Sequence, residues 1–284
     1  MNSTISEFVV IFTTQWINQM SAITWVAAFF LVWLLLWLPI AIPLMRRLQW
    51  QPFQPFTPAQ KLPLLASLYA IAPLLLWGYT VLAQVPFTHY GLRWQPSVLL
   101  SISVGIGIAV LGLLLLFGLQ QWQTWSLWQS AATVAFRNAL LPSFLIGLWV
   151  SITEELVFRG FLLNQLLTLF PAWGAAVGVS AIFAVLHLLW DRQETIPQLP
   201  GLWLMGMVLV LARWADQGLL GLAIGLHAGW VGSMISLDSS QVIQYSDRAP
   251  VWFTGVFHKP LAGWGGILLL MLTGAVVGAI GWIN

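Results

Sequence analysis

Residues 139–168 read ALLPSFLIGLWVSITEELVFRGFLLNQLLT, a continuous apolar run whose only charged residues are Glu154, Glu155 and Arg159. About 20 apolar residues are enough for a helix to cross the hydrocarbon core of a bilayer, so this run is long enough to span a membrane. Ionisable side chains inside such a segment are costly, and they usually face a bundle interior and carry function. The run therefore predicts a membrane-embedded helix with a buried polar site.

The composition of the whole chain also indicates a membrane protein. Of its 284 residues 60% are hydrophobic and only 6% are charged, and the mean hydropathy is +0.88; a soluble domain has about 25% charged residues. The absence of cysteine excludes disulfides, thiol nucleophiles and cysteine-ligated zinc. A formal net charge of +2 without basic clusters argues against a nucleic-acid partner. We expect an integral membrane protein of a bacterial plasma membrane or an internal membrane.

Seven further apolar segments flank the run at 139–168, and no linker, composition change or internal repeat divides the chain. The sequence predicts an all-α, polytopic transmembrane helical bundle of about eight spans. It forms a single integral-membrane domain over residues 1–284, with its core at 139–237. A shorter apolar stretch at 6–20 contains Gln and Asn, which predicts an interfacial helix. The predicted spans are 22–44, 62–84, 98–120, 139–168, 171–190, 201–215, 218–237 and 264–283.

Helical geometry predicts the directions in which the three charged residues of the fourth run point around the helix axis. At about 100° per residue, Glu155 and Arg159 lie about 40° apart, whereas Glu154 is turned about 100° away from Glu155. Arg159 is therefore predicted to pair with Glu155, which offsets part of the cost of burial, and Glu154 stays available for other contacts. A carboxylate in a low-dielectric site suits a general base or a proton shuttle. The alternative is a polar cluster that only holds helices together.

Two histidines in other predicted spans add to this group. His187 lies near the end of the fifth run, and His227 lies in the seventh within a stripe of Gly221, Gly225 and Gly229. Such a stripe predicts the close approach of a neighbouring helix. A single intramembrane histidine is usually a hydrogen-bonded core residue, but two of them together with a carboxylate pair and an arginine favour a functional site.

The order of these residues resembles the motifs of the CPBP family, the CAAX protease and bacteriocin-processing (Abi-like) group of intramembrane endopeptidases. Glu154–Gly160, EELVFRG, resembles the family motif E-E-x-x-x-R-G. The segment from Phe183 to His187 resembles F-x-x-x-H, and His227 resembles the first residue of H-x-x-x-N. The resemblance implies an intramembrane endopeptidase that hydrolyses a peptide bond of a hydrophobic or membrane-anchored substrate.

Carried over to this chain, the resemblance implies that Glu154 and His187 activate a water molecule. It further implies that Glu155 and Arg159 support the site and that His227 helps to hold the oxyanion. Amide hydrolysis requires a base for the water, a donor for the developing negative charge and a proton for the leaving amine, and these residue types can supply all three.

No cofactor is implied, since similar family members work as glutamate proteases. Two histidines and a glutamate could instead fill three ligand positions of a zinc ion, although the sequence has no H-E-x-x-H pair. A serine hydrolase is disfavoured, because Ser180 and Ser233 lack a G-x-S-x-G setting.

One position departs from the family pattern. Val231 stands where the third motif has Asn, and valine has no hydrogen-bond donor. Loss of one oxyanion donor costs on the order of 10²–10³ in rate. Either His227 and a backbone N–H suffice, or Ser233 or another group substitutes, or the chain is a catalytically weak or inactive membrane binding or immunity protein of the same family.

A transporter or proton channel could use the same buried carboxylates and imidazoles as a relay. The sequence shows neither inverted repeats nor paired broken helices, so this class is disfavoured. The predicted partners are therefore a peptide or protein substrate, with or without a lipid modification, and the lipid bilayer.

Overall fold

The computed structural model describes residues 20–51 and 56–283, which are almost entirely helical. The predicted all-α fold class is confirmed. Residues 6–19 of the predicted interfacial helix lie outside the described part of the chain.

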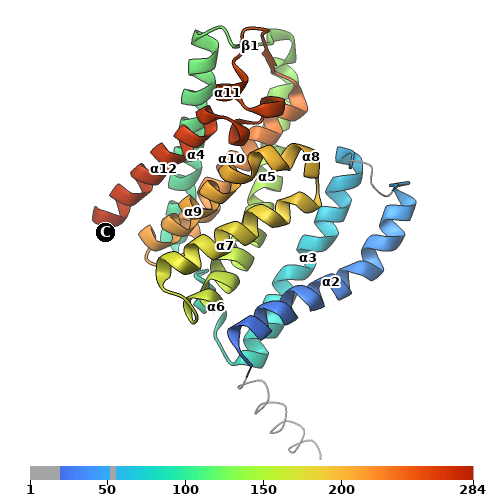
Figure 1. Ribbon diagram of the computed structural model, residues 1–284, viewed down its shortest axis with the longest axis vertical. Helices are drawn as coiled ribbons and strands as arrows, with labels where there is room; N and C mark the ends of the chain where they lie inside the picture. The colour runs from blue at the N-terminus through green and yellow to red at the C-terminus, as the bar shows by residue number, and fades with distance from the viewer. Residues whose placement is uncertain (1–19, 52–55, 284) are drawn as a thin grey trace, which may run out of the picture.

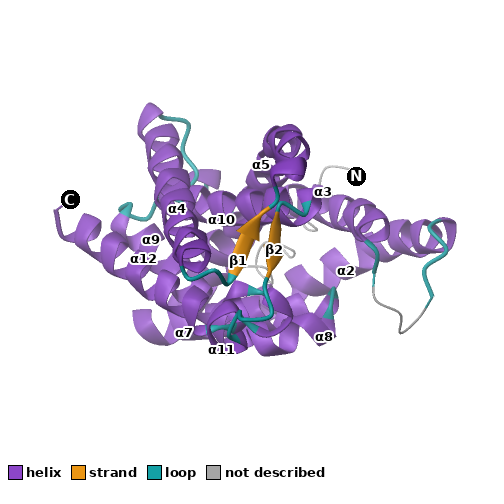
Figure 2. Cartoon of the chain, turned by 90° about the horizontal axis from the view of Figure 1, so that it is seen from above, coloured by secondary structure: helices purple, strands orange, loops and turns teal. Residues whose placement is uncertain are grey.

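Long helices make up most of the structure, with short helical segments and short strands between them (Figure 1). The long helices are α2 (Ala22–Arg47), α3 (Pro58–Ala83), α4 (Pro96–Trp122), α5 (Thr133–Glu155), α7 (Ala172–Leu186), α9 (Leu199–Ala215), α10 (Gly221–Ser240) and α12 (Trp264–Ile283). The short helical segments are η1 (Phe87–Tyr90), η2 (Ser130–Ala132), the π-helix η3 (Leu156–Leu162), α6 (Leu163–Leu167), η4 (His187–Leu189), α8 (Arg192–Thr195), η5 (Ile196–Gln198), α11 (Val251–Thr254), η6 (Val256–His258) and η7 (Pro260–Ala262). The strands β1 (Ser126–Trp128) and β2 (Ile243–Tyr245) pair antiparallel with Leu127 opposite Gln244, and Figure 2 shows them between α4 and α5.

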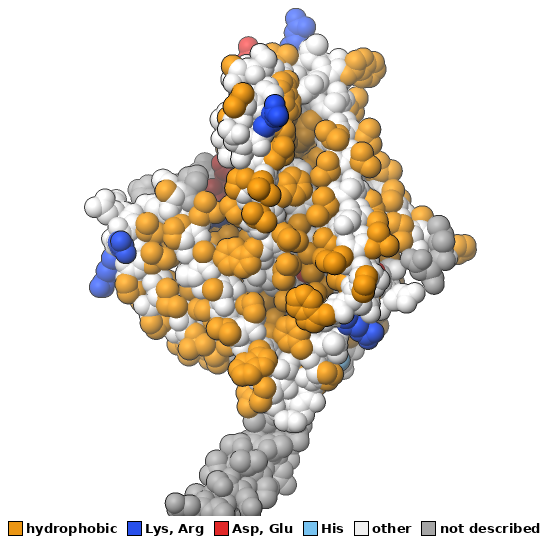
Figure 3. All heavy atoms as spheres, turned by 180° about the vertical axis from the view of Figure 1, so that it is seen from behind, with side chains coloured by type: hydrophobic (Ala, Val, Ile, Leu, Met, Phe, Trp, Pro, Cys, Tyr) orange, Lys and Arg blue, Asp and Glu red, His pale blue; other side chains and the backbone are white. Residues whose placement is uncertain are grey.

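Seven helical stretches within residues 20–51 and 56–283 are long and apolar enough to cross a membrane. The polytopic bundle is thus confirmed, with seven such stretches where the sequence predicted about eight. Figure 3 shows one face of the molecule covered with hydrophobic side chains, with Lys and Arg near its edges. This distribution is the one expected of a protein surrounded by lipid.

The difference in number lies in α10, which the sequence predicted as a span at 218–237. The segment is helical, but its glycines, serines and His227 leave it outside the seven apolar stretches. Residues 221–230 are all buried, so this half of α10 is surrounded by protein. The predicted run at 139–168 is one continuous helical stretch made of α5, η3 and α6.

Small residues place α10 directly against α4. A Cβ atom added to Gly225 would lie 2.2 Å from the carbonyl oxygen of Ile102, and one added to Gly229 would lie 2.6 Å from the Cβ atom of Ala109. Only glycine allows the two backbones to approach this closely. The predicted helix contact along the glycine stripe is therefore confirmed.

Helices α2 and α3 form a hairpin at one side of the bundle (Figure 1). Two indole N–H groups of α2 hold the hairpin together: Trp33 Nε1 donates to the Leu68 carbonyl oxygen at 2.9 Å, and Trp37 Nε1 donates to Ser67 Oγ at 3.0 Å. The other long helices lie beside this hairpin, and the polar residues predicted from the sequence lie in α5, η3, α10 and the segment that follows α7.

Candidate active site

The acidic pair lies where α5 changes into a π-helix. Glu155 is the last residue of α5, and the π-helix η3 begins at Leu156 and contains Arg159. All residues from 153 to 163 are buried. π-Helical turns are rare and occur frequently at functional sites, so the backbone itself marks this segment as unusual.

Glu155 and Arg159 form the predicted ion pair. Arg159 Nη1 lies 2.9 Å from Glu155 Oε1, and both side chains are completely buried. Arg159 Nη2 also donates to the Gly206 carbonyl oxygen at 3.2 Å, and the guanidinium carbon lies 4.4 Å from the centre of the Phe183 ring. The arginine therefore joins η3 to α7 and α9, and its charge is compensated without solvent.

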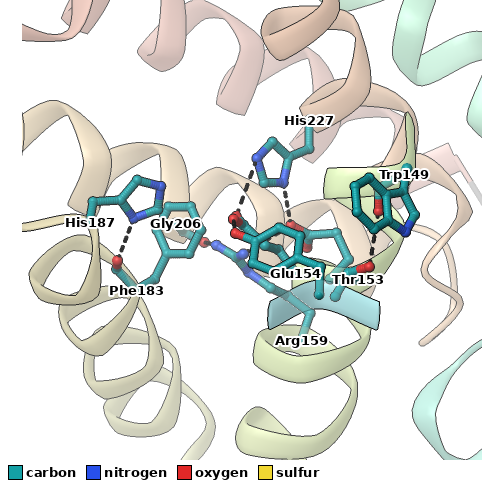
Figure 4. Close-up of polar contacts among 10 residues, drawn as sticks. Trp149, Thr153, Glu154, Arg159, Phe183, His187, Gly206 and His227 are labelled. Carbon is teal, nitrogen blue, oxygen red and sulfur yellow. Dashed lines mark hydrogen bonds and ion pairs between the residues drawn. The ribbon is translucent and has the colours of Figure 1, made fainter. Parts of the chain in front are cut away.

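His227 lies between the two carboxylates (Figure 4). Its Nδ1 atom is 2.8 Å from Glu155 Oε1, and its Nε2 atom is 3.6 Å from Glu154 Oε2. Because an ionised carboxylate can only accept hydrogen bonds, Nδ1 carries a proton that it donates to Glu155. The imidazole of α10 is thereby fixed against the acidic pair of α5.

Glu154 has separate contacts, as its helical position predicted. Its Oε1 atom accepts a hydrogen bond from the Tyr69 hydroxyl of α3. Its Oε2 atom is buried and has no hydrogen-bond partner within the described residues. The nearest polar contact given for Oε2 is His227 Nε2 at 3.6 Å.

His187 follows directly on the C-terminus of α7. Its Nδ1 atom lies 2.8 Å from the Phe183 carbonyl oxygen, so Nδ1 carries the proton and Nε2 keeps its lone pair. Figure 4 shows His187 on the opposite side of Phe183 from Arg159 and His227. The Phe183 ring centre is 4.5 Å from that of His187 and 6.0 Å from that of His227.

A cavity of about 280 Å³ brings Glu154 and His187 to the same space. Tyr69 also lines this cavity, and its remaining walls are apolar or aromatic side chains of α2, α3, η3 and the segment after α7. Four of the predicted site residues, Glu154, Glu155, Arg159 and His227, thus form one cluster of hydrogen bonds and ion pairs. The fifth, His187, makes no direct contact with that cluster's charged groups but faces the same cavity as Glu154.

Two residues of this region were missed by the sequence analysis. Tyr69 contacts Glu154 from outside the motif region, and only its hydroxyl within an apolar run could have drawn attention to it. Arg213, in α9, is buried and donates to the Arg159 carbonyl oxygen and to Asn164 Oδ1. Arg213 therefore forms a hydrogen bond with a backbone carbonyl of the π-helix, a contact that no sequence pattern predicts.

Within residues 20–51 and 56–283 no three His, Cys, Asp or Glu side chains are grouped as metal ligands. Both ring nitrogens of His227 face carboxylates. Ser233, considered as a substitute for the motif Asn, lines a different groove between α4, α5 and α10 that none of the five site residues lines.

Comparison with known proteins identifies the same segment. Residues 136–233 match the family model of the type II CAAX prenyl endopeptidase Rce1-like proteins. The match includes the acidic pair, the arginine and both histidines. No curated protein and no solved structure gives a significant match.

Proposed function

We propose that this membrane protein is an intramembrane endopeptidase with Glu154 as its general base. The match of residues 136–233 to the family model of the Rce1-like CAAX prenyl endopeptidases supports this proposal. One observation carries the proposal: Glu154 and His187 line a single cavity among membrane-embedded helices. A base and a water-orienting group that share one cavity are what hydrolysis requires.

In the proposed reaction a water molecule donates one hydrogen bond to Glu154 Oε2 and the other to His187 Nε2. Glu154 takes a proton as the water oxygen bonds to the peptide carbonyl carbon, and the carbonyl oxygen becomes an oxyanion. The same proton then passes to the amide nitrogen, and the C–N bond breaks. His227 can donate to the oxyanion only as an imidazolium ion, since its Nδ1 proton is held by Glu155.

The cavity walls favour a hydrophobic substrate segment. Phe30, Trp33 and Trp37 occupy one face of α2 and line the cavity together with Trp190. The indole N–H groups of Trp33 and Trp37 are already used within the α2–α3 hairpin, so both rings present apolar surface. We infer that the peptide to be cut enters from the membrane.

Turnover of fluorogenic hydrophobic peptides by the purified protein tests this proposal, with prenylated and unprenylated versions assayed in parallel. Glu154→Gln should abolish turnover while the melting temperature stays close to that of the wild type. Glu194→Gln, in a partly exposed ion pair on α8, is the matched control and should keep full activity. Equal turnover in wild type and Glu154→Gln would overturn the proposal, and loss of activity on metal chelation would reinstate the zinc mechanism.

Val231 favours a second candidate, an inactive binding or immunity protein of the same family. This chain has no amide donor at the motif position, and the site would then bind a peptide without cutting it. The same experiment separates the two. Peptide binding that is equal in wild type and Glu154→Gln, with no turnover in either, supports the binding protein.

A further inference from the structure

Tyr69 reaches the acidic pair from a different part of the chain. It lies in α3, only 7% exposed, and its hydroxyl donates to Glu154 Oε1. The edge-to-face contact with Trp149 of α5, with ring centres 6.2 Å apart and planes at 68°, holds the phenol ring against the helix that carries the acid. The hydroxyl is therefore fixed at the carboxylate.

Three other donors of the cavity wall are engaged elsewhere. Trp33 and Trp37 donate their indole protons to α3, and His187 donates its Nδ1 proton to Phe183. Tyr69 is thus the side chain in the cavity wall whose proton is directed at the acid. Because Val231 has no donor, the motif position four residues after His227 cannot supply one.

We propose that Tyr69 is a positioning residue of the active site: its hydroxyl holds the Glu154 carboxyl group at Oε1 and leaves Oε2 for the water. This inference rests on the proposed function and extends it, because Tyr69 lies outside the segment 136–233 that matches the family. With Oε1 occupied by Tyr69, only Oε2 is left to act as the base.

The position of Tyr69 also connects the base to the α2–α3 hairpin. Within the hairpin, Leu68 accepts the Trp33 indole proton and Ser67 accepts that of Trp37, so the residues next to Tyr69 are tied to the aromatic wall of the cavity. The hairpin that we propose lines the substrate path therefore also sets the geometry of the acid.

Tyr69→Phe removes the hydroxyl alone, and Tyr79→Phe is its matched control. Tyr79 lies on the same helix, its hydroxyl accepts from Gln165 at 2.7 Å, and it touches none of the five site residues. Tyr69→Phe should lower kcat by about 10- to 100-fold, the effect expected from losing a hydrogen bond to a charged group. KM should stay the same, and Tyr79→Phe should leave kcat unchanged.

The inference is overturned if the folded Tyr69→Phe protein, with a normal melting temperature, keeps the wild-type kcat. A loss of equal size in Tyr79→Phe would overturn it as well, since the effect would then reflect helix packing. Failure of the proposed function looks different, because the wild-type protein itself would show no turnover.

In that case infrared spectroscopy still tests the contact between Tyr69 and Glu154. The carboxyl band that disappears in Glu154→Gln identifies Glu154. Its frequency should change in Tyr69→Phe and not in Tyr79→Phe, whereas an unchanged frequency refutes the contact.

Discussion

Replacing Glu155 by Gln tests whether the buried charges are as tightly balanced as the geometry indicates. The substitution keeps the shape of the side chain and removes one negative charge. Arg159, completely buried and 2.9 Å from Glu155, then becomes a buried cation whose direct counter-ion is gone. The hydrogen bond from His227 Nδ1 also loses its charged acceptor.

The expected loss of stability depends on which contacts of Arg159 the substitution removes and which it keeps. Removing one partner of a buried ion pair typically destabilises a protein by about 3–5 kcal/mol. The glutamine oxygen can still accept from Arg159, and the guanidinium keeps its bond to the Gly206 carbonyl oxygen and its position over the Phe183 ring. We therefore expect a loss near the lower limit, about 3 kcal/mol, which corresponds to a fall of roughly 5–10 °C in melting temperature.

Thermal unfolding of the detergent-solubilised protein, followed by circular dichroism, measures this loss. Glu194→Gln makes the same chemical change in an ion pair with Lys259 whose side chains are 42% and 29% exposed, and it should alter the melting temperature by no more than about one or two degrees. The double variant Glu155→Gln with Arg159→Met should melt above Glu155→Gln, because the uncompensated charge is gone. If Glu155→Gln has the same melting temperature as the wild type, this balance of buried charges is refuted.

Three further predictions concern catalysis, packing and pH. Val231→Asn should raise peptide turnover, by up to about 10²–10³, in a steady-state assay, and an unchanged rate would show that no donor is lacking. Gly225→Ala should lower the melting temperature by several degrees, since its Cβ atom would lie 2.2 Å from the Ile102 carbonyl oxygen, whereas Gly107→Ala has open space and should not. Burial lowers the pKa of Lys259, but the carboxylates on α8 and α10 raise it more, so its pKa exceeds 10.5. The stabilisation that Lys259 gives is complete below pH 10.5 and is lost as the pH rises through this raised pKa. The destabilisation caused by Lys259→Met should therefore vanish above that pKa in pH-dependent melting curves.

The helical architecture and the ion pair could be predicted from the sequence because both depend on local spacing. Apolar length alone identifies the membrane-embedded helices. The four-residue interval between Glu155 and Arg159 places them on one face, and the pair is found there. The same angular argument left Glu154 free for other partners, which the contacts with Tyr69 and His227 confirm.

What could not be predicted depends on contacts between distant segments. Nothing in the spacing of α3 shows that Tyr69 meets a carboxylate 85 positions later. The π-helical turn after Glu155 also escaped prediction, because it is stabilised by tertiary contacts such as the bond from Arg213 to the Arg159 carbonyl oxygen. The catalytic roles of the site residues stay predictions, since they concern chemistry that geometry alone does not measure.

The difference between about eight predicted spans and seven sufficiently apolar helices has the same physical origin as the arrangement of the site. A charged or strongly polar group in lipid costs about 2.5–3.5 kcal/mol, yet α10 carries His227 inside a stretch, 221–230, that is buried on every side. There the surroundings are fixed dipoles and charges: Glu155 faces Nδ1, Glu154 faces Nε2, and glycines bring α4 close enough to exclude lipid. Hydropathy undervalues such a helix because it assumes lipid contact. The protein shell that makes α10 less apolar than the other long helices also keeps Glu154 and His227 oriented toward each other.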